Sequence, residues 1–146
     1  MDIIKLKKLL IEHEGYRLDL YQDTKGFLTA GIGHLMTKKD GPLVLGRKVT
    51  AEQVNLWFES DIQMAILIAK SYLGAAWNTL SEERKIVLVD MCFNLGPKIN
   101  KFVDFKAALV AGDYVLAVKS MQDSLWATQV PTRAKSLAKI MESGKL

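Results

Sequence analysis

The stretch from Thr50 to Gly74 constrains the fold most, because it is long, capped and helical in its spacing. Thr50 and Gln53 match a capping box, in which the side chain of each residue bonds the backbone N–H of the other. The pattern predicts one helix over 51–73, about 34 Å long at 1.5 Å per residue. Its apolar positions recur every three or four residues: Val54, Trp57, Phe58, Ile62, Ala65, Ile66, Ala69 and Leu73.

Everything after this helix predicts more helices. Each predicted segment opens on a residue that can cap or start a helix, and two of them end at a glycine. The predicted helices are 82–95 capped by Ser81, a short helix capped by Asp104 and ended by Gly112, another capped by Asp113, and one from Pro131 to about Glu142.

The residues before Thr50 follow another pattern. A first helix is predicted over 3–13, and Gly15 suits the left-handed position after its end. Residues 17–21 alternate between polar and apolar, as a half-buried strand does. Asp23 opens a turn, D-T-K-G, in which its side chain can bond nearby amides. Two further strands are predicted, one over 27–35 and one over 43–49.

Strands and helices are therefore segregated along the chain, which predicts an α+β class. We expect a single domain with a small antiparallel sheet lobe at about 15–50 and a connecting helix at about 51–73. A helical lobe at about 74–146 would include the helix 3–13. A cleft between two such lobes is where ligands commonly bind.

Composition narrows the range of partners. A basic balance favours polyanions such as nucleic acid, anionic lipid or cell wall, but the net charge of +4 is mild and dispersed, which argues against nucleic acid as the main partner. No apolar run reaches the roughly 20 residues of a membrane span, so stable membrane insertion is not expected. The N-terminus lacks the features of a signal peptide. Cys92, the only cysteine, lies in an apolar helical pattern and is expected to be buried. The protein is expected to be a monomer.

Two carboxylates occupy unusual places. Glu14 sits at a helix C-terminus, where the partial negative charge disfavours an ionised side chain. This position, and burial against apolar neighbours, predict a raised pKa, as a general acid needs. Asp23, in a polar turn, is expected to stay ionised. Taken alone, however, a glutamate before a glycine is usually a surface residue, and an aspartate in such a turn usually shapes the turn.

Other catalytic chemistries have no motif in this chain. There is no H-E-x-x-H and no paired C-x-x-C, so neither a metal site nor any cofactor is predicted. There is also no G-x-S-x-G and no phosphate-binding loop. The two carboxylates remain the best candidates for chemistry.

The segment from Glu14 to His34 reads E-G-x-R-L-x-x-Y-x-D-T-x-G-x-x-T-x-G-I-G-H. It resembles the N-terminal signature of phage-type lysozymes, the bacteriophage muramidases of glycoside hydrolase family 24. Two later motifs look like C-terminal landmarks of that family, F-N-x-G at 93–96 and P-x-R-A at 131–134. The similarity extends over nearly the whole chain, although it is looser in the helical lobe.

The resemblance implies cleavage of the β-1,4 bond between N-acetylmuramic acid and N-acetylglucosamine in peptidoglycan. Glu14 then corresponds to the general acid, Asp23 to the second carboxylate, and Thr29 to the hydroxyl that helps to hold the attacking water. The family generally inverts the anomeric centre. Inversion places water between the two carboxyl groups and separates them by roughly 6.5–9.5 Å.

The same resemblance implies substrate contacts. Leu35 and Phe93 match saccharide-contacting positions, although both also suit plain core packing. Phe105 and Ser120 fall where other contacts are expected, without a motif match, and a bulky Phe105 can reshape that subsite. Arg133 resembles an arginine near the catalytic glutamate.

His34, at the end of the signature, needs a partner. Asp61 in the long helix is the candidate by its place in the helical pattern. We expect the pair to brace the site without taking part in the chemistry.

Several alternatives remain open at this point. A lytic transglycosylase needs the acid but no carboxylate that positions water, so Asp23 and Thr29 argue against it. A non-catalytic wall-binding module needs no poised Glu14. A cationic amphipathic helix that disrupts the wall directly is a third possibility. The family implies storage in the host cytoplasm and release to the wall through a membrane pore made by another protein.

Overall fold

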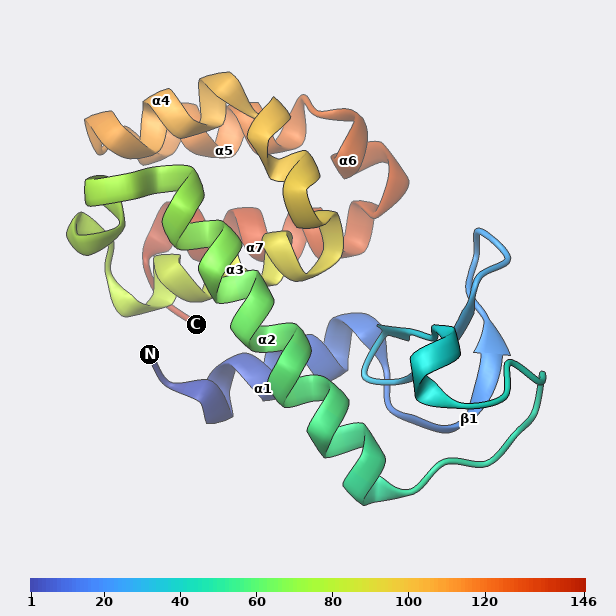
Figure 1. Ribbon diagram of the computed structural model, residues 1–146. Helices are drawn as coiled ribbons and strands as arrows, with labels where there is room; N and C mark the ends of the chain where they lie inside the picture. The colour runs from blue at the N-terminus through green and yellow to red at the C-terminus, as the bar shows by residue number, and fades with distance from the viewer. The chain divides into compact units, whose positions relative to one another are not determined.

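The computed structural model describes all 146 residues and divides into two compact units (Figure 1). The N-terminal unit is Ile3–Gln63, and the C-terminal unit is Met64–Leu146 together with Met1 and Asp2. The boundary falls inside one long helix. A small antiparallel sheet accompanies many helices, and this confirms the predicted α+β class.

Helix α1 spans Ile3–Glu14 and buries Leu6, Leu9 and Leu10. Its last residue is Glu14, and Gly15 follows with φ +79° while its N–H bonds the carbonyl of Ile11 at 2.8 Å. This is the predicted glycine-ended helix, since a left-handed φ costs glycine little.

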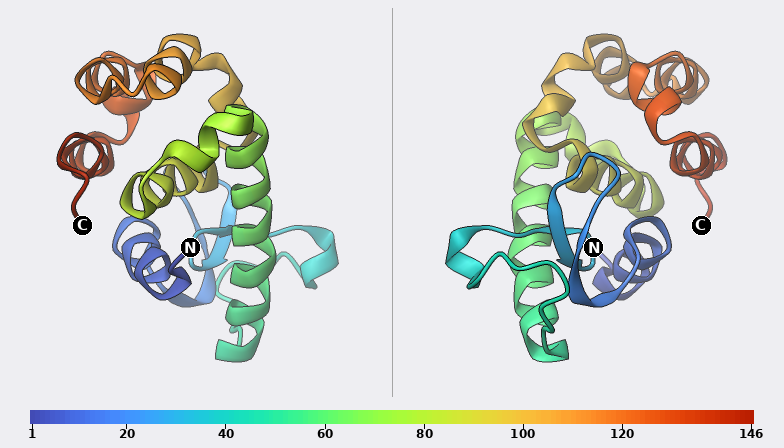
Figure 2. Two further views of the ribbon diagram at one scale, coloured as in Figure 1. Left: turned by 90° about the vertical axis from the view of Figure 1, so that its left-hand side faces the viewer. Right: turned by 90° about the vertical axis from the view of Figure 1, so that its right-hand side faces the viewer.

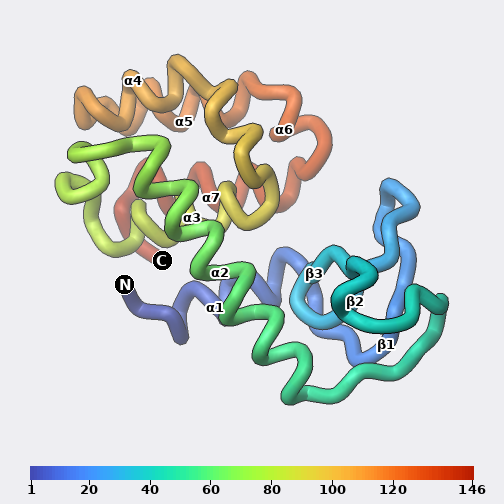
Figure 3. Tube along the Cα trace, in the orientation of Figure 1, coloured from blue at the N-terminus to red at the C-terminus, as the bar shows by residue number.

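The sheet has three antiparallel strands in the order β1–β2–β3: Arg17–Gln22, Leu28–Gly31 and His34–Leu35 (Figure 3). The turn that opens at Asp23 joins the first two strands, as predicted. Tyr21 of β1 lies opposite Thr29 of the central strand β2, and Thr29 lies opposite Leu35 of β3. Because directly opposed residues project to the same face, these three side chains form one row across the sheet.

The prediction of a single strand over 27–35 is wrong. The segment contains β2 and β3, and a tight turn through Gly31 and Gly33 reverses the chain between them. The two glycines have φ of +61° and +58°, values that side-chain-bearing residues rarely adopt. The alternation of residues gave no sign that the chain folds back here.

The prediction of a strand over 43–49 is also wrong. The segment makes only an isolated bridge, between Lys48 and Asp19. It nevertheless lies alongside β1 and is joined to it by backbone hydrogen bonds, from Leu20 N to Arg47 O at 2.9 Å and from Gly46 N to Leu20 O at 2.8 Å. A turn of 3₁₀-helix, η1 (Lys38–Asp40), precedes it in the loop.

Helix α2 spans Ala51–Leu73, as predicted, and forms one unbroken rod (Figure 2). Its capping box is present, with Thr50 N bonded to Gln53 Oε1 at 3.0 Å and Gln53 N bonded to Thr50 Oγ1 at 3.1 Å. In the N-terminal unit, Lys7 of α1 donates to Asn55 Oδ1 at 3.2 Å and lies over the ring of Phe58. These contacts hold α1 against the first half of α2.

The C-terminal unit contains helices throughout. Two predicted caps are confirmed: Ser81 accepts from Arg84 N at 3.3 Å, and Asp113 accepts from Leu116 N at 3.0 Å. The elements are η2 (Gly74–Thr79), α3 (Glu82–Leu95), η3 (Gly96–Lys101), α4 (Val103–Ala111), α5 (Tyr114–Gln122), α6 (Leu125–Gln129) and α7 (Pro131–Ser143).

Two details of this unit differ from the prediction. Asp104 lies within the first turn of α4, and the capping position belongs to Phe102, which makes no side-chain cap. The short helix α6 was not predicted, although Ser124 caps it through a 3.2 Å bond to Ala127 N. Five residues are too few for a periodic pattern to be visible in the sequence.

The core of the C-terminal unit contains a buried ion pair. Arg133 Nε lies 2.7 Å from Asp90 Oδ1, and the guanidinium also donates to the Asp90 carbonyl at 3.2 Å. The side chains are 6% and 0% exposed. Each charge depends on the other, because an isolated charge in such surroundings is costly.

Cys92 is buried, as predicted, and burial raises the pKa of its thiol to about 12. It is therefore a packing residue of α3 and not a reactive thiol.

None of the helices combines the length and the apolar character that crossing a membrane requires.

Asp90→Asn is expected to destabilise the protein by about 3 kcal/mol, because it removes the carboxylate from a buried ion pair. Urea unfolding followed by circular dichroism measures this change. The matched control is Asp104→Asn at an exposed position of α4, which should cost no more than about 0.5 kcal/mol. A loss below about 1 kcal/mol for Asp90→Asn would show that the pair contributes little.

Candidate active site

Glu14 lies against the glycine turn between β2 and β3. The side chain is half-buried, and its carboxyl group covers the Cα of Gly33. A Cβ at position 33 would lie 2.2 Å from Glu14 Oε2 and 2.8 Å from Glu14 Cδ. Position 33 therefore requires glycine for two reasons: its φ is positive, and the Glu14 carboxyl group occupies the space that a Cβ would need.

The turn after β1 holds Asp23 in a fixed orientation. Its Oδ1 accepts hydrogen bonds from the backbone N–H groups of Lys25 and Phe27, both at 2.9 Å. The backbone N–H of Asp23 in turn donates to the Phe27 carbonyl at 2.9 Å. Both bonds to the side chain fall on Oδ1, so Oδ2 is the oxygen that can accept from a ligand or a water molecule.

Thr29 is buried in the middle of the sheet, with 5% of its surface exposed. Its hydroxyl donates to the Phe27 carbonyl at 3.1 Å, which fixes the position of Oγ1. A hydroxyl that has donated its proton still carries lone pairs, so it can accept a hydrogen bond from water.

Tyr21 connects these three residues. Burial is the largest of the effects that raise the pKa of its phenol, and the negative charge of Glu14 raises it further. Asp23 also raises the pKa, while Arg17, whose guanidinium lies 4.4 Å from the ring centre, opposes the shift. Asp19 raises the pKa of this phenol as well, and the strand partner of Tyr21 is Thr29.

The sequence reasoning did not select Tyr21. The tyrosine is part of the E-G-x-R-L-x-x-Y motif and stands two residues before Asp23. The strand ladder reveals its place, because it sets Tyr21 opposite Thr29, and the sequence alone carries no signal for that register.

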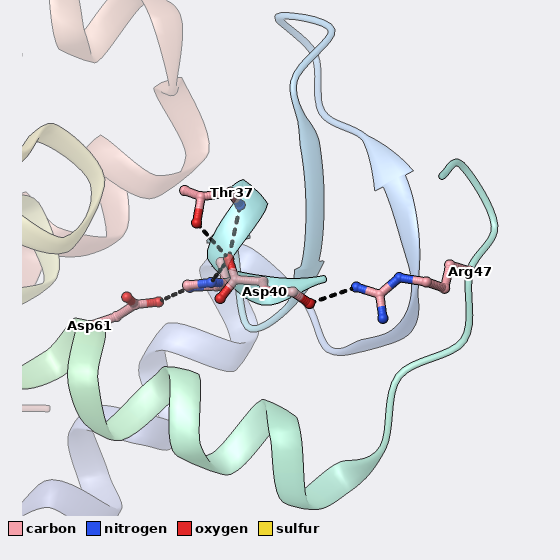
Figure 4. A network of polar contacts seen from close by, with 5 residues as sticks. Thr37, Asp40, Arg47 and Asp61 are labelled. Atoms are coloured by element: carbon pink, nitrogen blue, oxygen red, sulfur yellow. Dashed lines mark hydrogen bonds and ion pairs between the residues drawn. The ribbon is translucent and has the colours of Figure 1, made fainter. Parts of the chain in front are cut away.

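His34 is held from two sides by the carboxylates of Asp61 and Asp40, which Figure 4 labels. Its Nδ1 lies 2.6 Å from Asp61 Oδ2, which confirms the predicted pair. Its Nε2 lies 3.1 Å from Asp40 Oδ2, a contact that was not predicted. The imidazole also stacks on Trp57, with ring centres 4.8 Å apart and planes within 6°.

These contacts set the charge of the histidine. Burial lowers the pKa of His34, but the hydrogen bonds and charges of Asp61 and Asp40 together raise it above its usual value of 6.5. Burial likewise raises the pKa of Asp40, while the Thr37 amide and His34 bring it below its usual value of 3.8. His34 and Asp40 thus act on each other, because the charged form of each favours the charged form of the other.

Leu35 is the predicted substrate contact in the N-terminal unit. It is 55% exposed and belongs to the row formed with Thr29 and Tyr21. An exposed apolar side chain at the end of this row is available to a ligand.

The other predicted contacts lie in the C-terminal unit. A cavity of about 560 Å³ brings Phe105 and Ser120 together, with the rings of Phe102 and Trp126 beside them. Phe93 is half-buried on α3 and is not among the residues that line this cavity. Arg133 makes the ion pair with Asp90 described above.

The stability that His34 contributes should depend on pH. The pKa of His34 is higher in the folded protein than in the unfolded chain, where it is about 6.5. The resulting stabilisation is complete below pH 6.5 and is lost as the pH rises through the pKa of the folded state. The lowered pKa of Asp40 acts in the opposite range, because its contribution exists above about 3.8 and is lost on acidification.

His34→Gln should therefore cost about 1–3 kcal/mol between pH 4 and 6.5, and less at pH 9. Urea unfolding of the wild type and the variant across this range measures the difference. A difference that grows between pH 6.5 and 9 would contradict the assignment.

Comparison with known proteins identifies the family of this chain. The phage lysozyme family model matches residues 11–139. The chain is 31% identical, over 98% of its length, to the pre-baseplate central spike protein Gp5 of Enterobacteria phage T4, but it spans only 28% of that protein.

Two probable T4-type lysozymes of Dictyostelium discoideum are 29% and 31% identical, and the chain covers 97% of each. The peptidoglycan hydrolase gp36 of Pseudomonas phage phiKMV is 28% identical, and the chain spans 15% of it. The signature from Glu14 to His34 lies within the matched region, and it supplies Glu14, Asp23, Thr29 and His34 of the site described above. The chain therefore belongs to the phage lysozyme family.

Proposed function

We propose that this chain is a peptidoglycan hydrolase that cleaves the β-1,4 bond between N-acetylmuramic acid and N-acetylglucosamine and inverts the anomeric centre. The observation that carries the proposal is that the backbone of Phe27 holds both Asp23 and Thr29: its N–H donates to Asp23 Oδ1 at 2.9 Å, and its carbonyl accepts from the Thr29 hydroxyl at 3.1 Å. Membership of the phage lysozyme family supports the same reaction class.

Glu14 is the general acid in this proposal. Its carboxyl group rests on Gly33, whose missing side chain lets the carboxyl approach the backbone, and so it has a defined position. A glycosidic bond needs its leaving oxygen protonated as it breaks, and a positioned carboxylic acid supplies that proton.

Asp23 and Thr29 together place the attacking water. The two turn amides hold Oδ1 of Asp23, so Oδ2 can accept a proton from the water. The Thr29 hydroxyl donates to the Phe27 carbonyl, so its lone pair can accept the second water hydrogen. Two acceptors at fixed positions orient the water oxygen toward the anomeric carbon, as an inverting displacement requires.

Leu35 is the exposed member of the row across the sheet, which supports a saccharide contact there, because its apolar surface can lie against a sugar face. In the C-terminal unit, the cavity that contains Phe105 and Ser120 can make contacts of its own with the glycan or its substituents. Phe93 remains a candidate for a substrate contact, and Arg133 remains a candidate for a supporting role.

Glu14→Gln should reduce wall lysis by at least about 1,000-fold while it leaves glycan binding intact, because an amide cannot donate the acid's proton. Loss of turbidity of purified peptidoglycan measures the rate. The matched control is Glu12→Gln, an exposed position on the same helix, which should retain wild-type activity.

An active Glu14→Gln variant would refute the proposed acid. Product analysis addresses the remaining alternative: hydrolysis yields a reducing end, whereas a lytic transglycosylase yields an anhydro-muramic end. Proton NMR of the first product formed from a β-linked glycan should show the α-anomer if the centre is inverted.

Gly33→Ala should reduce activity by about 100-fold or more, because the new Cβ displaces the Glu14 carboxyl group. Gly26→Ala is the matched control, since Gly26 also has positive φ, +85°, but a Cβ there meets no atom within 4 Å. Both variants should lose about 1–2 kcal/mol of stability through backbone strain. Equal activity of the two variants would contradict the role assigned to the close contact.

A further inference from the structure

Both ring nitrogens of His34 are occupied by carboxylates that come from different elements. Asp61 belongs to α2, and Asp40 belongs to η1 in the loop after β3 (Figure 4). The histidine therefore links its own strand to the long helix on one side and to the loop on the other.

Asp40 is itself held firmly. Its Oδ2 accepts from the Thr37 backbone N–H at 2.8 Å and from the Thr37 hydroxyl at 3.2 Å, in addition to the His34 contact. Its carbonyl accepts from the Arg47 guanidinium at 2.9 Å. A carboxylate held by this many partners has little freedom, so it acts as a fixed point for the imidazole.

His34 directly follows Gly33, the residue on which the Glu14 carboxyl rests. The two residues belong to the turn and strand that return the chain after β2, and His34 pairs with Ala30 in the sheet. A displacement of His34 therefore moves the backbone under Glu14. Because misplacement of a reacting group by about 1 Å can cost 100-fold in rate, this coupling has a catalytic consequence.

We propose that Asp40 is a positioning residue: by holding Nε2 of His34 opposite Asp61, it fixes the Gly33 backbone and so the place of the Glu14 carboxyl group. This inference rests on the proposed function, because it assumes that Glu14 is the acid. It assigns a role to a residue outside the signature from Glu14 to His34.

The arrangement works fully only with a protonated ring. An imidazolium has two N–H donors, one for each carboxylate, whereas a neutral imidazole has only one. On deprotonation, one of the two contacts loses its donor and sets a nitrogen lone pair against a carboxylate oxygen. Asp61 and Asp40 raise the pKa of His34, so the doubly held state persists to a higher pH than it would for a histidine without these partners.

The test is Asp40→Asn, which keeps the shape but removes the charge, compared with Asp61→Asn and with Lys39→Gln. Lys39 is exposed in the same turn and belongs to neither the site nor the network, so Lys39→Gln reports any general effect of altering the turn. NMR titration of the His34 ring, the pH profile of lysis, and kcat and KM on soluble glycan are measured for each.

The expected result for Asp40→Asn is a lower His34 pKa, a kcat reduced by about 5- to 100-fold, and a KM within about twofold of wild type. The alkaline limb of its pH profile should move to lower pH together with the His34 pKa. Lys39→Gln should match wild type in all four readouts. Asp40→Glu, which restores a carboxylate, should recover part of the loss.

A role confined to stability would lower the unfolding free energy of Asp40→Asn but leave kcat and the alkaline limb unchanged, and that result would overturn the proposal. If Asp40→Asn does not fold, Thr37→Val decides, because it weakens the hold on Asp40 and must show a smaller shift of the same kind. An active Glu14→Gln would instead defeat the proposed function, and the His34 titration would still report whether Asp40 controls the ring.

Discussion

The contact between the Glu14 carboxyl and the Gly33 backbone is the constraint around which the N-terminal unit is arranged. It requires a helix that ends at Glu14, and Gly15 with its positive φ supplies that end. It also requires a chain reversal without a side chain at its tip, which splits the returning segment into β2 and β3. The sheet and the first helix are thus fitted to one another at a single close approach.

Charged groups within the fold are held in clusters in both units, but the clusters differ in kind. Asp90 and Arg133 form a compact pair shielded from solvent, where each charge exists because the other does. His34 lies in a partly exposed cluster with Asp61 and Asp40, and its charge can change with pH. The first cluster is suited to permanent structure, and the second is suited to a response near neutral pH.

The sequence predicted the parts of this fold that depend on long patterns and failed where short-range geometry decides. Helix α2 was predicted to the residue because its capping box and apolar spacing agree. The split of 27–35 into two strands depends on the dihedral angles of two glycines, which alternation does not encode.

The candidate site shows the same division. Asp61 was predicted as the partner of His34 because its position in a regular helix is fixed, and the structure confirms the contact. Asp40 was missed because its position depends on an irregular loop, and Tyr21 because its importance emerges only across the strand ladder. The separation of the two carboxyl groups and their roles stay predictions.

The irregular segment beside β1 has a consequence for how copies of this chain meet. A sheet normally offers two open edges to which a neighbouring chain can add a strand. Here the backbone of 46–49 already bonds one of them, through Leu20 with Arg47 and Val49 with Leu18. The opposite border, β3, is only two residues long. Both borders of the sheet therefore leave only a short template for edge-to-edge pairing.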